Sequence, residues 1–145
     1  MDKINPQKTA FYSIEKAIKA YRKMAQKNIS QVVSDITLDQ IQVLTILDSN
    51  PECSQKEIAE ILFKDYASIT RMIELLVKKD YLLRQIHQQD RRMFHLVISE
   101  KGKDTIEILK PIILKNRQTA LNNISIDEIT KLSQSLNKII NNCTE

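Results

Sequence analysis

The sequence contains little glycine and no tryptophan: Gly102 is the only glycine among its 145 residues. A glycine-rich phosphate loop or a dinucleotide-binding turn needs several glycines close together, so both are excluded. No His-Glu-x-x-His or Gly-x-Ser-x-Gly motif occurs either. The two histidines, His87 and His95, have no nearby cysteine or paired carboxylates, and we interpret them as surface residues. We therefore expect no enzymatic activity, no cofactor and no metal site.

Long apolar runs are also missing. No run approaches the roughly 18 to 20 residues that cross a bilayer, and the first six residues lack the apolar core of a signal peptide. The only cysteines, Cys53 and Cys143, are far apart in the sequence, so we expect reduced thiols that are buried as small apolar residues. These absences predict a cytoplasmic protein without a membrane partner.

The positive charge is concentrated in one part of the chain. The formal net charge is +4, and residues 64–103 carry nine Lys or Arg against five Asp or Glu, while the remaining 13 cationic and 13 acidic residues cancel. A localised basic surface is the electrostatic footprint expected of a protein that binds a phosphate backbone. Solvated charges alone could also produce an excess of this size.

The same segment predicts a helix followed by a basic hairpin. Its apolar residues have the spacing of one helical stripe, and the opposite face carries small or hydrogen-bonding residues. Residues 81–86 and 93–98 resemble strands, and the polar residues 87–92 separate them. The arrangement is that of a winged helix. The stripe consists of Ile69, Met72, Ile73, Leu76 and Val77.

The residues before this helix predict the first part of a helix-turn-helix. Thr37 and Ser54 each begin a capping-box motif, and Pro51 separates the two helices that these motifs open. The first of these helices is apolar nearly all round, which predicts a position in the middle of the domain. The second is short, and a turn separates it from the long helix, as in a helix-turn-helix. Its expected buried side consists of Ile58, Ala59, Ile61 and Leu62.

Both ends of the chain predict helices with more apolar surface than a small domain can cover. The first helix, from about Pro6 to Val33, would either contact a partner chain or pack in the core, with about equal support. The last helix, opened by a third capping-box motif at Ser125, has a heptad seam too short for an independent coiled coil. In the helix between them, Pro111 predicts a kink or a break near Leu109. The expected dimer-interface residues are Ile14, Ile18, Ile129, Leu132, Leu136 and Ile139.

Four phrases of the sequence carry a resemblance to a known family. They are Ser-Ile-Thr-Arg-Met-Ile-Glu-Leu-Leu at 68–76, Lys-Lys-Asp-Tyr-Leu-Leu-Arg at 78–84, Asp-Arg-Arg at 90–92 and Leu-Val-Ile-Ser-Glu-Lys-Gly at 96–102. With the order of elements, they make the chain resemble the MarR family of bacterial transcriptional regulators. The resemblance implies a mainly α (α+β) fold and a homodimer on a palindromic operator. It divides the chain into an N-terminal dimerisation helix (1–36), a winged-helix head (37–99) and C-terminal helices that complete the dimer base (100–145).

The resemblance also implies roles for wing residues. Arg92 matches the arginine that the family presents from the wing to a minor groove, and Asp90 matches the acid that fixes the loop. Asp65 matches a carboxylate that some members place near the wing. Arg91 stands at a variable position and would add a phosphate contact. Arg92 could instead form an ion pair with Asp90 inside the chain.

A possible effector pocket is implied in the same way. Thr70 and Arg84 match positions that line an aromatic-acid site in some relatives, so the expected effector is a small aromatic or phenolic compound. The peroxide-sensing subgroup is not supported, because the first helix contains no cysteine.

The chemistry of the residues then suggests how DNA would be read. Serine and threonine can bond several bases, and arginine can bond guanine with two hydrogen bonds. The first N–H groups of the short helix could hold a phosphate. Two alternatives remain open: Ser54 could simply cap its helix, and Arg71 could pair with Glu74. The candidate DNA contacts are Ser54, Gln55, Tyr66, Ser68, Thr70, Arg71, Arg91 and Arg92.

These observations predict a sequence-specific DNA-binding transcriptional regulator, with a ligand-responsive repressor as the detailed hypothesis. Its partners would be double-stranded DNA, a second copy of the chain and the effector. The alternative is a winged helix used for protein contacts without specific DNA binding. The localised charge favours DNA.

Overall fold

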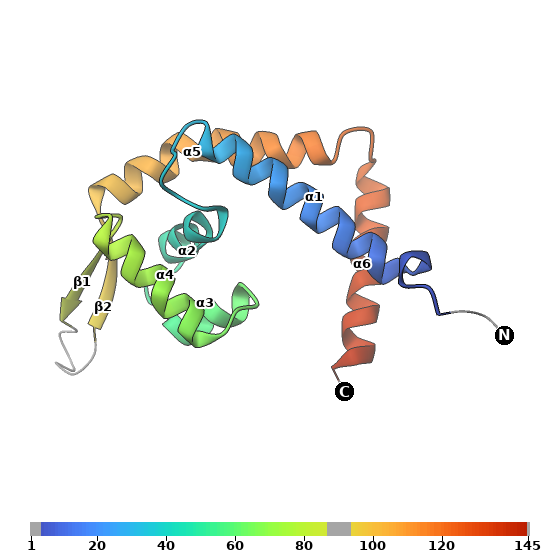
Figure 1. The fold of residues 1–145 in the computed structure, drawn as a ribbon, viewed down its shortest axis with the longest axis horizontal. Coiled ribbons are helices and arrows are strands. Elements are labelled where there is room, and N and C mark those ends of the chain that lie inside the picture. The colour runs from blue at the N-terminus through green and yellow to red at the C-terminus, as the bar shows by residue number, and fades with distance from the viewer. Residues whose placement is uncertain (1–3, 87–93, 145) are drawn as a thin grey trace.

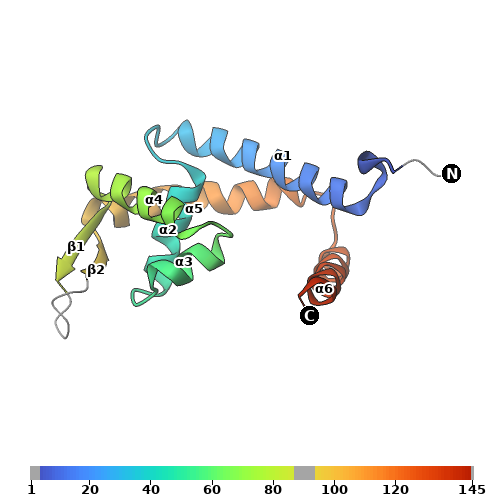
Figure 2. The same cartoon turned by 60° about the horizontal axis from the view of Figure 1, so that its bottom comes forward.

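The computed structural model describes residues 4–86 and 94–144, and this part of the chain is mainly helical with one antiparallel hairpin. Helices α1 and α5 lie side by side. The head, which consists of α2, α3, α4 and the hairpin, packs at one end of this pair, and α6 lies at the other end (Figures 1 and 2). None of the described helices is long and apolar enough to cross a membrane. The elements are a 3-10 turn (Pro6–Lys8), α1 (Ala10–Ser30), α2 (Leu38–Ser49), α3 (Gln55–Ile61), α4 (Tyr66–Lys78), β1 (Leu82–Ile86), β2 (Phe94–Ile98), α5 (Glu100–Ala120) and α6 (Ile126–Cys143).

Every described α-helix begins after a residue whose side-chain oxygen accepts a backbone N–H three positions later. The capping boxes predicted at Thr37, Ser54 and Ser125 are all present. The first helix starts later than predicted, because Thr9 is extended and caps α1 after the separate turn. The cap residues are Thr9, Thr37, Ser54, Asp65, Ser99 and Ser125.

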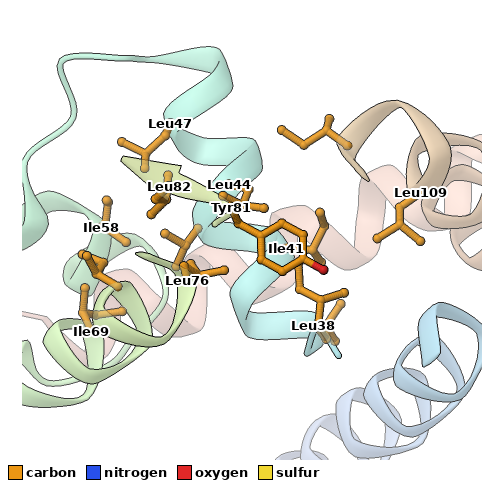
Figure 3. Packing of buried hydrophobic residues seen from close by; sticks show 14 of the residues in the cluster. Leu38, Ile41, Leu44, Leu47, Ile58, Ile69, Leu76, Tyr81, Leu82 and Leu109 are labelled. Carbon is orange, nitrogen blue, oxygen red and sulfur yellow. The ribbon is translucent and has the colours of Figure 1, made fainter. Parts of the chain in front are cut away.

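Helix α2 lies at the centre of the head, as its apolar circumference predicts. Its buried side chains face α4 on one side and Leu109 of α5 on another (Figure 3). One prediction for α3 is wrong: Ile61 is 51% exposed, whereas Ile58 and Ala59 are buried. Ile61 is the last residue of this seven-residue helix, and the chain turns immediately after it. The buried apolar residues of α2 are Leu38, Ile41, Val43, Leu44 and Leu47.

The end of α4 is joined tightly to the start of α5. Asp80 adopts a left-handed conformation (φ 65°), which a short polar side chain tolerates, and the Tyr81 N–H donates to the Leu76 carbonyl at 2.9 Å in the helix-ending pattern typical of that conformation. The Ser99 N–H then donates to the Tyr81 carbonyl at 3.1 Å. A Cβ at Gly102 would lie 2.4 Å from that carbonyl oxygen, so this close approach requires glycine.

The predicted hairpin is present. Its strands are antiparallel, and Leu82 pairs with Ile98 and Arg84 with Leu96. The predicted tip residues Asp90, Arg91 and Arg92 lie outside the described residues.

Helices α5 and α6 resolve three further predictions. Helix α5 runs through Pro111 without a break, and Leu109 and Asn116 on either side of the proline are buried. Helix α6 has no buried residue, and its seam residues are at most half-buried within this chain. Cys53 is buried as predicted, but Cys143 is exposed, because it belongs to that uncovered helix.

Candidate nucleic-acid interface

We call the outer face of α4, which carries Tyr66, Ser68, Thr70 and Arg71, the reading surface. Helix α3 contacts α4 beside it. The Gln55 amide on α3 donates a hydrogen bond to the Thr70 hydroxyl on α4, and that hydroxyl donates to the Tyr66 carbonyl at 3.0 Å. The structure thus brings two predicted DNA contacts together. The Gln55 amide nitrogen and the Thr70 hydroxyl are already bonded to each other, and this bond links α3 to α4.

The start of α4 is capped by a charged residue. The Asp65 carboxylate accepts the Ser68 N–H at 2.7 Å and the Ser68 hydroxyl at 3.1 Å. These bonds, the backbone one first, hold the pKa of Asp65 below its ordinary value. Asp65 is therefore a helix cap in this structure, a role that the sequence analysis did not give it. Its contact with the wing stays a prediction, because the tip is not described.

The outer face of α4 is open. Tyr66 is 58% exposed, Ala67 and Arg71 are also exposed, and Ser68 and Thr70 are half-buried. Within residues 4–86 and 94–144 no ion pair joins Arg71 to Glu74, so the described contacts do not support that alternative. A guanidinium on an open helical face can approach a phosphate or a base edge.

Ser54, at the start of α3, has local partners. Its hydroxyl accepts the Glu57 N–H at 3.1 Å, and its own N–H donates to the Glu57 carboxylate at 3.3 Å. The capping role considered for Ser54 is confirmed. A phosphate at this helix start would compete with the Glu57 carboxylate, and this contact stays a prediction.

A cavity of about 410 Å³ lies away from the reading surface, between α1, α2 and α5. Neither Thr70 nor Arg84 lines it; Arg84 is exposed on β1. No pattern in the sequence was interpreted as this cavity. Lys110 and Arg117 could have indicated it, because residues seven positions apart share one face of a helix and these two place their cations on the same face of α5. Its walls include Tyr21, Ile41, Ile106, Lys110, Ile113 and Arg117.

Comparison with known proteins agrees with this geometry. Residues 36–94 match the sequence model described as the MarR family. The transcriptional regulator SarZ of Staphylococcus epidermidis is 28% identical over 100 residues, which cover 68% of this chain but only 65% of SarZ, slightly less than two thirds of its length.

Solved structures of related shape support the fold. Bordetella bronchiseptica BpsR, whose DNA binding is regulated by 6-hydroxynicotinic acid, has a TM-score of 0.83 at 19% identity over 95% of this chain and 97% of that one. S. aureus MepR, solved in complex with DNA, has a TM-score of 0.82 at 20% identity over 97% of this chain and all of the other. The match to the MarR family model thus covers residues 36–94, which include the described helix-turn-helix and the base of the hairpin.

Proposed function

We propose that this protein is a DNA-binding transcriptional regulator whose helix α4 enters a major groove. The observation that carries the proposal is the open face of α4, where Tyr66, Ser68 and Arg71 lie on a helix that a Gln55–Thr70 hydrogen bond joins to α3. The excess positive charge of residues 64–103 supplies the attraction to phosphates. The solved MepR complex, of similar fold, supports DNA as the ligand.

The uncovered apolar faces support a homodimer. The first half of α1 and the whole of α6 bury no side chain within this chain. Apolar surface of this extent is usually covered by a partner. A two-fold dimer would present two heads, and its operator would be a palindrome with half-sites about one helical turn apart. The proposed contacts are Ile14, Ile18, Ile129, Leu132, Leu136 and Ile139.

The cavity beside α5 supports a response to a small ligand. Its apolar walls and the cations of Lys110 and Arg117 suit an aromatic acid, and the structurally similar BpsR responds to 6-hydroxynicotinic acid. Asp48 and Glu107 also line the cavity, so a ligand must place its acid near the cations. We favour this cavity over Thr70 and Arg84 as the effector site, and repression relieved by the ligand as the mode of action.

A binding assay tests the proposal. The full-length chain is used to select a duplex from a random-sequence library, and its affinity is measured by fluorescence anisotropy over a range of salt. We expect Arg71→Ala to weaken binding about tenfold, because a good arginine–base contact contributes about 1–3 kcal/mol. Lys138→Ala on α6, with the same loss of charge, should change it little.

The alternative, a winged helix that contacts proteins, makes the opposite prediction. It requires that no duplex is enriched and that binding to any duplex is equal for the wild type and Arg71→Ala. That result would refute DNA reading by α4.

A further inference from the structure

One carboxylate joins three elements that are far apart in the sequence. Asp39 lies in the first turn of α2. One oxygen of its carboxylate accepts a hydrogen bond of 2.5 Å from the Arg22 guanidinium of α1. Its other oxygen lies 3.2 Å from the Lys64 ammonium, in the turn between α3 and α4. The dimer-base helix α1 and the turn before the reading helix are therefore linked through one side chain.

The link is partly shielded from water. The Asp39 side chain is 23% exposed, and those of Lys64 and Arg22 are 30% and 40% exposed. Burial alone would raise the pKa of Asp39, but the bonds from Arg22 and Lys64 outweigh it and hold the pKa below its ordinary value. Asp39 is thus charged at neutral pH and engaged on both oxygens.

Lys64 is well placed to transmit this constraint. Its backbone N–H donates to the Ala59 carbonyl at 2.9 Å, so the turn itself is fixed to the end of α3. The next residue is Asp65, the cap of α4. A tether at Lys64 therefore acts one residue away from the start of the reading helix.

We propose that Asp39 is a positioning residue, which holds the start of α4 at a fixed orientation to α1 through Lys64 and Arg22. This inference rests on the proposed function, because the orientation matters for DNA only if α4 reads it. A head held at one angle matches the spacing of specific contacts, whereas non-specific binding depends on charge and tolerates other angles.

The neutral variant Asp39→Asn separates positioning from electrostatics, because the two predict opposite changes. Removing a negative charge near the reading surface should by itself tighten binding to DNA. If Asp39 positions α4, the variant should bind the selected duplex about tenfold more weakly and a random-sequence duplex equally or more tightly.

Matched variants complete the comparison. Glu60→Gln, on the exposed face of α3, removes the same charge without touching the link and should not weaken binding to the selected duplex. Lys64→Arg keeps the ion pair and should retain wild-type specificity, whereas Lys64→Gln should lose it. Equal specificity ratios for Asp39→Asn and Glu60→Gln would overturn the inference, with circular dichroism verifying that each variant is folded.

A measurement without DNA separates this inference from the proposed function. Hydrogen exchange of the free protein should become about tenfold faster over residues 62–68 in Asp39→Asn, with no change in α6. Unchanged exchange there would overturn the positioning role. Faster exchange together with no DNA selected by the wild type would instead refute DNA binding and leave the tether in place.

Discussion

The Tyr81 hydroxyl donates a hydrogen bond of 2.6 Å to the Asp35 carboxylate, across 46 positions of sequence. It fixes the segment after α4 to the loop between α1 and α2. Lys101 at the start of α5 lies 4.3 Å from the centre of the same ring. Tyr81 is buried, so both ends of α4 are anchored: its start through Lys64 and its end through Tyr81.

This pair predicts a stability that depends on pH. Burial, with the Asp35 bond, raises the pKa of Tyr81 to about 12, and the Tyr81 bond lowers the pKa of Asp35. Because the pKa of Tyr81 in the folded protein is higher than the unfolded value of about 10, Tyr81 stabilises the fold fully below about pH 10. This stabilisation is lost as the pH rises through about 12. Because the pKa of Asp35 in the folded protein is lower than its unfolded value, Asp35 stabilises the fold fully above about pH 4. This stabilisation is lost as the pH falls through the pKa of the folded protein.

Tyr81→Phe should therefore lower the free energy of unfolding by about 1 kcal/mol at neutral pH. Urea denaturation at several pH values measures the difference. The difference should shrink above about pH 10 and below about pH 4. A difference that is constant across this range would exclude the hydrogen bond as its source.

Gly102→Ala should destabilise the protein by about 2 kcal/mol, because the new methyl group would overlap the Tyr81 carbonyl and the Ile98 side chain. Helix propensity alone predicts the opposite sign, a gain of about 1 kcal/mol. Thermal unfolding distinguishes the two. Lys103→Ala, on the exposed face of the same helix, is the control and should be nearly neutral. A Gly102→Ala protein more stable than wild type would contradict the close approach.

Phe63→Gly should stabilise the protein by about 0.5 kcal/mol. Phe63 has φ 56° and is 95% exposed, so its ring contributes little burial while its Cβ disfavours this left-handed backbone. Glycine removes the strain at some cost in chain entropy. Phe63→Ala keeps the Cβ and should give no gain. A marked loss of stability in Phe63→Gly would show that the ring makes a stabilising contact.

Arg92→Ala should weaken binding to the selected duplex about fivefold while leaving the protein folded and self-associated. The resemblance predicts that this arginine reaches a minor groove from the wing. Fluorescence anisotropy at moderate salt gives the affinity, and Lys138→Ala provides an equal loss of charge away from the head. Unchanged binding by Arg92→Ala would remove the wing from the mechanism.

Leu132→Lys should convert a dimer into a monomer. Leu132 is 55% exposed within the chain and lies on the α6 seam, so a partner that covers it would have to bury the new ammonium. Light scattering coupled to size exclusion gives the mass. Gln134→Lys, off the seam of the same helix, should leave the mass unchanged. A wild-type protein with the mass of one chain would refute the dimer itself.

Local chemistry made much of this protein readable from its sequence. The helix starts at Thr37, Ser54 and Ser125 follow from side chains that bond N–H groups only three residues away. The buried stripe of α4 and the hairpin follow from periodicity. The left-handed turn at Asp80 also has a local cause, because a short polar side chain tolerates it. A helix followed by a basic hairpin already indicated a winged helix, and the family phrases agreed with it.

Relations between distant segments were decided only by the tertiary structure. The Arg22–Asp39–Lys64 link, the bond from Tyr81 to Asp35 and the cavity between α1, α2 and α5 depend on how helices pack, which no local pattern encodes. Packing also bears on two local signals. Of the kink or break predicted at Pro111, the break is absent, and Leu109 and Asn116 on either side are buried. Gly102 is required by a carbonyl that arrives from another element, whereas in the sequence it is only a weak helix former.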